Sequence, residues 1–402
     1  MQVTGESSIK VGTFQWPAGF YADAGHAGLK ETADDLGWLV SKVPAAAAGV
    51  YTTNQFQAAP TTLTKQTINS DHQLQAMVMN SGNANSCTGV QGTHDAMAMQ
   101  QAAADKLGID PMMVGVASTG VIGEQLPLDK IVSGIAQLGL TKHDGVTKAV
   151  LTTDTHAKTI TVQCLIDNQK VTITGFCKGS GMIHPNMATM LGFVTTDAKI
   201  AGDQLQALLS QTVNQTFNQI TVDGDTSTND MVVTMANGQA GNQALTPTHE
   251  DYPTFVKAFK LVLSHLAKEI AADGEGASKL VEVNVTGAYN DLEGQQVAKA
   301  IVGSNLVKAM IFGADANWGR VMQAIGQTTA HLDVAGVSVA INGIQMVQNS
   351  LATDYDEAAV TKSLAEKVVT IDVDLNAGSA IGTAWGCDLT YKYVQINASY
   401  RS

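Results

Sequence analysis

The chain has 402 residues, of which 45% are hydrophobic, only 15% are charged and 38 are glycine. This composition is typical of a compact, loop-rich enzyme, excludes a disordered or fibrous protein, and leaves room for two or more packed units. The formal net charge of −13 argues against a nucleic-acid partner, because binding a phosphate backbone needs concentrated positive charge.

Strand-like and helical patterns alternate along the chain, which predicts a mixed α/β fold. Leu, Phe, Val and Ile recur at intervals of three and four over 251–272, the clearest amphipathic helix, and Gly274 is its natural stop. The other expected elements before it are strands over 75–79 and 170–175 and helices over 93–106, with Thr93 as cap, and 200–217.

The last third of the chain predicts a smaller α+β unit over about 280–402. Asn342-Gly343 between two alternating apolar segments is the best hairpin signal in the sequence. The expected elements of this unit are strands over 281–285, 368–375 and 389–396 and helices over 292–312, with Gly303 as a weak point, and 356–367.

The cysteines and histidines show no metal-binding pattern. Four cysteines occur without a CxxC pair, and no Cys/His spacing suits zinc, so free thiols and no metal are expected. The N-terminus lacks the basic start and apolar core of a signal peptide, and no apolar run reaches membrane-spanning length. We therefore expect a cytoplasmic protein without a membrane partner.

The most informative segment is KGSGMIHPNMATML, from Lys178 to Leu191. A threonine hydroxyl is a poor nucleophile unless a base stands beside it, and cutting the chain before Thr189 would supply its own α-amine as that base. Such an amine has a reference pKa of about 7.7, which suits a general base near neutral pH. On composition alone, the segment is more typical of a buried strand after a turn.

This segment resembles the signature of the ornithine acetyltransferase family, the ArgJ proteins of arginine biosynthesis. The resemblance extends along nearly the whole chain, with order and spacing kept. Ala316 stands where the family usually has proline, and the chain ends in Ser402 where threonine is common. The matching blocks are AGVYTTN from Ala48, AAP from Ala58, NSGNANSCTG from Asn80, ASTGVIG from Ala117, TTDT from Thr152, DGDTSTND from Asp223, DGEG from Asp273, DANWGR from Asp315 and NASYRS from Asn397.

The resemblance implies a self-processing, layered fold of the N-terminal-nucleophile type, shared with the DmpA aminopeptidases. It implies cleavage between Ala188 and Thr189 into an α chain, 1–188, and a β chain, 189–402, assembling as two α and two β chains. Thr189 is then the nucleophile, and Thr119 and Gly120 form the oxyanion hole. A glycine allows close backbone approach and a threonine adds a hydroxyl donor, although Ser-Thr-Gly is more often a simple turn.

The remaining residues that the resemblance assigns to substrate are Thr152, Lys178, Thr189, Glu275, Asn397 and Ser402. Because the chain has only two arginines, Lys178 is the expected partner of a substrate carboxylate, although a lysine before Gly-Ser-Gly is ordinarily a solvated turn residue. Glu275, between two glycines, is expected to bind the substrate ammonium group, and is otherwise a surface carboxylate. Ser402 requires the C-terminal tail to dock, since such tails usually fray.

The resemblance favours transfer of acetyl from N2-acetyl-L-ornithine to L-glutamate through an acetyl-threonine intermediate, with ping-pong kinetics and no cofactor. The complete core motifs favour acetyl-CoA as a second donor, and the amino acids are the expected small-molecule partners. One alternative has the same nucleophile with water as acceptor, a self-processing aminopeptidase or amidase. Another is a non-enzymatic, uncleaved binding protein.

Overall fold

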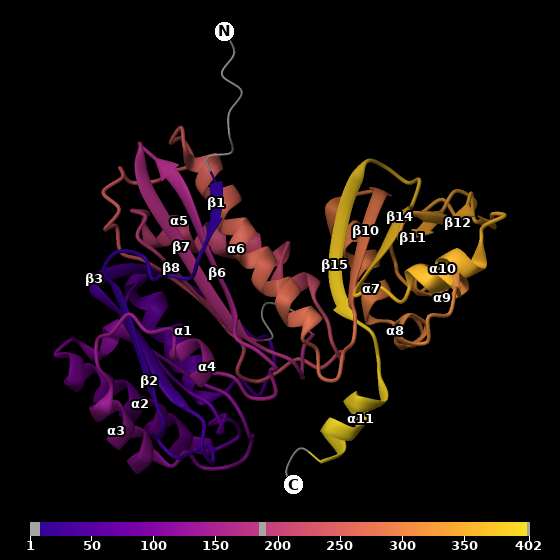
Figure 1. Ribbon diagram of the computed structural model, residues 1–402. Coiled ribbons are helices and arrows are strands. Elements are labelled where there is room, and N and C mark those ends of the chain that lie inside the picture. The colour runs from indigo at the N-terminus through magenta and orange to yellow at the C-terminus, as the bar shows by residue number, and fades with distance from the viewer. Residues whose placement is uncertain (1–8, 185–189, 400–402) are drawn as a thin grey trace. The chain divides into compact units, whose positions relative to one another are not determined.

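A computed structural model describes residues 9–184 and 190–399 of the chain (Figure 1). The chain divides into two compact units. Unit 1 comprises Met1–Gly179, Asn186–Asn214 and Thr226–Leu266; unit 2 comprises Ser180–Pro185, Gln215–Asp225 and Ala267–Ser402. Both combine a sheet with helices, so the prediction of a mixed α/β fold is confirmed.

Unit 1 is built on a nine-stranded sheet in the order β1-β6-β7-β8-β9-β3-β4-β5, with β2 paired to β3. The pairs β4–β5 and β8–β9 are parallel, and the other pairs are antiparallel. The strands are β1 (Ile9–Gly12), β2 (Phe20–Gly25), β3 (Leu36–Tyr51), β4 (Gln73–Asn80), β5 (Val114–Ser118), β6 (Lys158–Ile166), β7 (Gln169–Lys178), β8 (Leu191–Thr196) and β9 (Met231–Ala236).

Alternate side chains of this sheet fill two separate cores, because successive residues of a strand point to opposite faces. On β3, Trp38 belongs to a core shared with helices α2 and α3, whereas Leu39 packs with Phe176 and Phe193 on the opposite face. The helices are α1 (Ala59–Asp71), α2 (Gly89–Leu107), α3 (Leu128–Gln137), α4 (Val146–Ala149), α5 (Gly202–Asn214) and α6 (Tyr252–Ala272).

Unit 2 contains a six-stranded sheet in the order β13-β12-β11-β14-β10-β15, in which only β10 and β14 run parallel among the described residues. Its helices α7, α8 and α9 contribute to one apolar core with the sheet. The elements are β10 (Leu280–Ala288), α7 (Asp291–Gly303), α8 (Asn305–Phe312), α9 (Trp318–Gly326), β11 (Ser338–Ile341), β12 (Ile344–Gln348), β13 (Leu351–Ala352), α10 (Glu357–Ser363), β14 (Val368–Asp374), β15 (Ala380–Cys387) and α11 (Tyr391–Ala398).

One expected strand and one expected helix cap were wrong. The segment 389–396 is not a strand: helix α11 occupies Tyr391–Ala398, and the Thr390 hydroxyl accepts a hydrogen bond from the Lys392 amide at its first turn. Helix α2 begins at Gly89 rather than at 93, so Thr93 lies inside the helix and is not its cap. The expected helix over 292–312 is divided into α7 and α8 at Ser304, directly after the weak point at Gly303.

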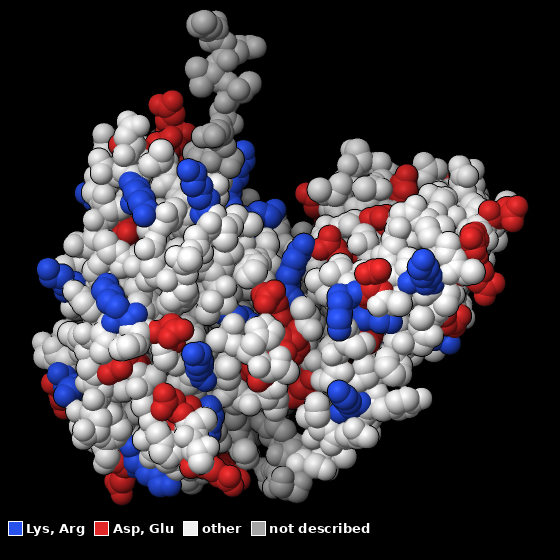
Figure 2. All heavy atoms as spheres, in the orientation of Figure 1, with Lys and Arg blue, Asp and Glu red and all other residues white. Residues whose placement is uncertain are grey.

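Acidic and basic side chains are interspersed over the visible face of each unit (Figure 2). The net negative charge is therefore not concentrated in one patch on that face. Among the described helices, none combines the length and the apolar character needed to cross a membrane. The four cysteines are free, and only Cys87 is exposed.

Candidate active site

In unit 1 the structure brings Lys178 and Thr119 together. Lys178 is the last residue of β7, and Thr119 directly follows β5. The Lys178 ammonium nitrogen lies 3.2 Å from the Thr119 hydroxyl oxygen and donates a hydrogen bond to it. Because that oxygen accepts from the lysine, the Thr119 hydroxyl proton remains available to a further acceptor.

Gly120 has a backbone conformation that suits an oxyanion donor. Its φ is +131°, and a Cβ placed there would lie 2.4 Å from the carbonyl carbon of Gly82, so only glycine fits without displacing backbone. The amides of Thr119 and Val121 on either side donate to the carbonyls of Asn80 and Gly82. For the Gly120 amide there is no acceptor among the described residues.

Asparagine side chains hold this turn in place. The Nδ2 atom of Asn229 donates to the carbonyl oxygens of Ser118 and Ala84, at 2.8 and 2.5 Å. The hydroxyl of Ser118 donates to Oδ1 of Asn80 at 2.6 Å. Asn80 and Asn229, from the two motifs that begin at Asn80 and Asp223, therefore both bind Ser118, the residue before Thr119 and Gly120. Both motifs thus help to fix the position of this turn.

Thr152 and Lys178 are connected through a buried carboxylate, Asp154. Its Oδ2 accepts a hydrogen bond from the Thr152 amide at 3.2 Å, and its Oδ1 accepts from the Gly179 amide at 2.7 Å. Lys158 donates to the same Oδ1 at 2.7 Å, and both side chains of this ion pair are 0% exposed. Burial by itself would raise the pKa of Asp154, but the charges of Lys178 and Lys158 outweigh it and lower that pKa.

A second buried carboxyl group, Asp230, lies at the start of β9. In the parallel pair of β8 and β9, Leu191 is opposite Met231, and the Met231 amide donates to the carbonyl of Met190. Burial raises the pKa of Asp230 well above its usual range, against the opposing effect of hydrogen bonds from Ser227. Its Oδ2 atom has no partner among the described residues.

In unit 2 the structure brings Glu275 and Asn397 together. The Asn397 Nδ2 atom donates to Oε2 of Glu275 at 2.7 Å and to the carbonyl of Tyr393 at 3.0 Å. Glu275 is only 7% exposed, and its amide donates to the carbonyl of Ser180. A Cβ at Gly181 would lie 2.3–2.4 Å from the Glu275 carboxyl atoms, so the glycine leaves the space that this carboxylate occupies.

The chain around Gly181 is fixed by Asp223. The two oxygens of Asp223 accept hydrogen bonds from the amides of Met182 and Ile183, at 2.7 and 2.8 Å, and Oδ2 also accepts from the Tyr393 hydroxyl at 3.2 Å. His184 shares a hydrogen bond with the Thr221 hydroxyl at 2.9 Å. Burial, followed by the charge of Lys299, lowers the pKa of His184 to about 4, so this imidazole is neutral at pH 7.

Three predicted site residues, Ala188, Thr189 and Ser402, lie outside the described residues. The carboxyl groups of Asp154, Asp223 and Asp230 were missed as site residues by the sequence reasoning. A usable signal existed, because each lies within a matching block of a chain that has only 15% charged residues. Their function in the structure depends on hydrogen bonds to residues distant in sequence, which the motifs do not reveal.

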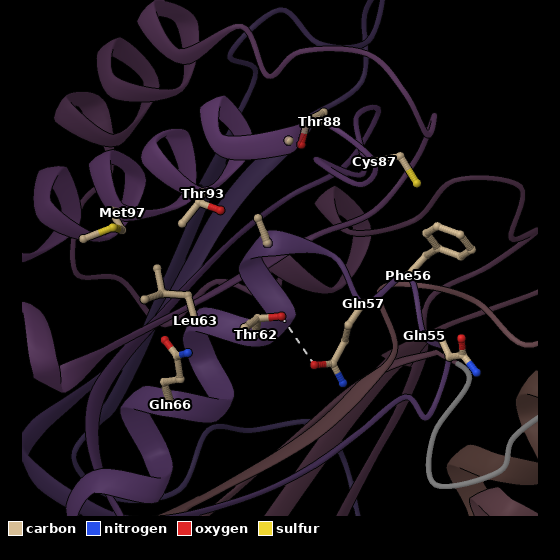
Figure 3. A pocket seen from close by; sticks show the side chains of 12 residues that line it. Gln55, Phe56, Gln57, Thr62, Leu63, Gln66, Cys87, Thr88, Thr93 and Met97 are labelled. Atoms are coloured by element: carbon tan, nitrogen blue, oxygen red, sulfur yellow. Dashed lines mark hydrogen bonds between the residues drawn. The ribbon is translucent and has the colours of Figure 1, made fainter.

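Two further features lie outside the predicted site residues. A pocket of about 440 Å³ at the N-terminal ends of α1 and α2 is lined by uncharged residues, including Phe56, Cys87 and Met97 (Figure 3). Asp167, His249 and Asp251 place potential metal-ligand atoms within 4.8 Å of one another. Hydrogen bonds already link this trio, since His249 contacts Asp167 at 3.3 Å and accepts from the Asp251 amide at 3.1 Å.

A backbone amide without a described acceptor, a neighbouring hydroxyl and a nearby lysine are typical of enzymes that stabilise a developing oxyanion during acyl transfer. Comparison with known proteins identifies the family. The ArgJ family model matches residues 21–402. The chain belongs to the ArgJ family of arginine biosynthesis enzymes, which confirms the family and the enzyme predicted from its motifs.

The relatives of known name are similar over their whole length. The arginine biosynthesis bifunctional protein ArgJ of Lactiplantibacillus plantarum is 61% identical over 402 residues, which is 100% of both chains. The protein of the same name from Oceanobacillus iheyensis is 52% identical over 98% of both chains. A solved argJ structure from Bacillus halodurans is 55% identical with a TM-score of 0.52, and the match covers 53% of this chain and 100% of that chain.

Proposed function

We propose that the protein transfers an acetyl group from N2-acetyl-L-ornithine to L-glutamate through an acetyl ester on Thr189. The observation that carries this proposal is the turn at Thr119 and Gly120. There a backbone amide that has no acceptor in the described part of the chain and a hydroxyl proton can both donate to one oxygen. Membership of the ArgJ family supports the same reaction.

The reaction has two balanced halves. The Thr189 α-amine accepts the hydroxyl proton as the oxygen attacks the acetyl carbonyl, and the Gly120 amide and the Thr119 hydroxyl donate to the oxyanion. Collapse breaks the C–N bond, and the ornithine amine leaves with the proton that the α-amine took up. The amino group of glutamate then attacks the ester, gives up a proton and regenerates the threonine hydroxyl.

Within this proposal two charged side chains recognise substrate groups. In unit 1, Lys178 is the proposed partner of a substrate carboxylate, and Thr152 lies on the loop tied to it through Asp154. In unit 2, Glu275 is the proposed partner of a substrate ammonium group and is oriented by Asn397. Ser402 is proposed as a further substrate contact.

We also propose self-cleavage between Ala188 and Thr189. A piece beginning at Thr189 has 402 − 188 = 214 residues, which is 53% of the chain. The solved Bacillus halodurans chain is matched in full by the same share of this chain. Intact mass measurement under denaturing conditions tests the cut: two species with Thr189 at a new N-terminus are expected, and an active single species of 42.0 kDa would contradict it.

An acceptor assay separates transfer from hydrolysis. Release of ornithine that depends on glutamate supports transfer, whereas equal release into water would identify an aminopeptidase or amidase. An intact chain that takes up no acyl group would identify a binding protein. The ping-pong mechanism predicts parallel double-reciprocal lines.

Acetyl-CoA as a second donor, an assembly of two α and two β chains, and a cytoplasmic location are further proposals. An acyl-enzyme mechanism does not depend on the leaving group, so a thioester can replace the acetamide if its acetyl end reaches the site. Release of CoA thiol in the presence of glutamate tests the second donor. The uncharged pocket of Figure 3 offers no lysine or arginine for its phosphates.

A further inference from the structure

The ion pair between Asp154 and Lys158 is unusual because both side chains are fully buried. Asp154 lies in the loop before β6, and Lys158 is the first residue of that strand, with 2.7 Å between Nζ and Oδ1. Removing two charges from water is costly, and buried pairs can often be replaced by apolar residues without loss of stability. Stability is therefore a weak reason for this pair to exist.

The contacts of Asp154 instead point to the candidate active site. One oxygen accepts from the Thr152 amide, and the other accepts from Gly179, the residue directly after Lys178. The carboxylate thus ties together the backbones of two segments that are 25 or more residues apart in sequence. After the opposing effect of burial, the charge of Lys178 is the largest influence on the pKa of Asp154, so the two groups lie close in space.

Lys30 binds the backbone of the same loop on the N-terminal side of Thr152. The Lys30 ammonium group donates to the carbonyls of Leu151 and Ala149, at 2.7 and 3.2 Å. Lys30 therefore fixes the backbone just before Thr152, and the Asp154 carboxylate fixes the Thr152 amide. Such a loop has little freedom to shift.

Lys158 is the lysine that forms the direct ion pair with Asp154. Lys158 donates to the Asp154 carboxylate at 2.7 Å, whereas the only hydrogen bond that the structure gives the Lys178 ammonium group among the described residues is to the neutral Thr119 hydroxyl. Without Lys158, the nearby Asp154 carboxylate would be free to form a direct ion pair with Lys178.

We propose that Asp154 is a positioning residue of the acetyl-transfer site. It joins Thr152 to the Lys178-Gly179 step, while Lys158 neutralises it and leaves the Lys178 charge available for a substrate carboxylate. This inference rests on the proposed function, in which Lys178 and Thr152 contact the substrate.

The test is the charge-neutral double variant Asp154→Asn/Lys158→Met. It keeps similar side-chain volumes and the same net charge. The asparagine can accept at only one of its two terminal atoms, so one of the two backbone amides loses its acceptor. Glu282→Gln/Lys268→Met is the matched control, because that pair, at 2.6 Å, is partly exposed and lies in unit 2.

We expect the Asp154/Lys158 variant to keep a thermal midpoint close to that of its control. The KM for glutamate and for N-acetylornithine should rise by about tenfold to a hundredfold, the scale of a misplaced binding group, with a smaller fall in kcat. A donor lacking the α-carboxylate should have the same KM in variant and wild type. Lys158→Met alone should also raise the KM for glutamate, because Asp154 then captures Lys178.

Unchanged KM values in a folded double variant would overturn the inference. A fall in thermal midpoint without a change in KM would do the same, because it would show a purely structural pair. If the wild-type protein itself transfers no acetyl group to glutamate, the proposed function fails instead, so the two failures are distinguishable.

Discussion

Replacing Gly181 by alanine should displace the Glu275 carboxylate. The new Cβ would lie 2.3 Å from Cδ and 2.4 Å from both carboxylate oxygens of Glu275, whereas ordinary contacts begin at 3.4 Å. The carboxylate oxygens must therefore retreat by 3.4 − 2.4 = 1.0 Å. Gly181 is not among the glycines with positive φ, so the alanine adds volume without backbone strain.

The retreat would break the bond that orients Glu275. The distance between Oε2 of Glu275 and Nδ2 of Asn397, now 2.7 Å, would become as long as about 3.7 Å, which is beyond hydrogen-bonding range. A hydrogen bond to a charged group contributes about 1.5–3 kcal/mol, which corresponds to roughly tenfold to 150-fold in affinity. We expect the KM for glutamate to rise within this range and the protein to remain folded.

Steady-state kinetics with varied glutamate, together with a thermal melt, provide the measurement. Gly326→Ala is the control, since nothing lies within 4 Å of a Cβ at that position of unit 2. A Gly181→Ala protein with a normal melt and a glutamate KM within about twofold of wild type, well below the expected loss of a charged hydrogen bond, would refute the reasoning.

Three further substitutions test the rest of the site. Gly120→Ala should lower the melting temperature and reduce turnover by about 10²–10³-fold, because its Cβ would collide with the Gly82 backbone and disturb the oxyanion donor; a loss below about tenfold would place the oxyanion hole elsewhere. Thr189→Ala should remain a single 42.0 kDa chain without transferase activity, as judged by denaturing gel and acetyl-transfer assay, and residual turnover would show a different nucleophile. Asp230→Asn should stabilise the protein at neutral pH, because above the unfolded pKa of 3.8 the unfolded chain ionises while the buried carboxyl resists ionisation. The gain in melting temperature should shrink to nothing below pH 3.8, and a gain that is independent of pH would contradict the burial argument.

Elements with a strong local pattern were predicted well from the sequence. The helix expected over 251–272 is α6, Tyr252–Ala272, because apolar residues repeat with the helical period along its 21 residues. The hairpin at Asn342-Gly343 is confirmed, and both residues have the positive φ values, 48° and 77°, that its tight turn requires.

The errors occurred where the local pattern was ambiguous. Leu389 to Ile396 has enough apolar alternation to suggest a strand, but α11 has no buried residue among those described, so no apolar face marks it as a helix. The true strand, β15, contains Gly382 and Gly386, which weaken the strand signal. Gly382 is required by packing, since a Cβ there would lie 2.0 Å from the Gly294 backbone of α7.

The candidate site was likewise predicted only in part from the sequence. The family motifs predicted Thr119, Lys178, Glu275 and Asn397, and the structure brings the first two together in unit 1 and the last two together in unit 2. The carboxylate of Asp154 could not be predicted as a link, because its two backbone partners, Thr152 and Gly179, are joined only by the fold. Likewise, the position of Asp230 next to β8 follows from the sheet register, in which Leu191 lies opposite Met231, and not from any sequence motif.

The strand order has a consequence for the fate of the two cleavage products. Strands β8 and β9 belong to the proposed β chain, yet in the sheet they lie between β7 and β3, which belong to the proposed α chain. Six residue pairs join β8 to β7, and another six join β9 to β3. The products are thus interleaved, and neither can dissociate without exposing two long unpaired strand edges. Cleavage before Thr189 would therefore create a new N-terminus while the two chains stay associated. The cleaved protein should migrate as one species under native conditions and separate into two chains only on denaturation.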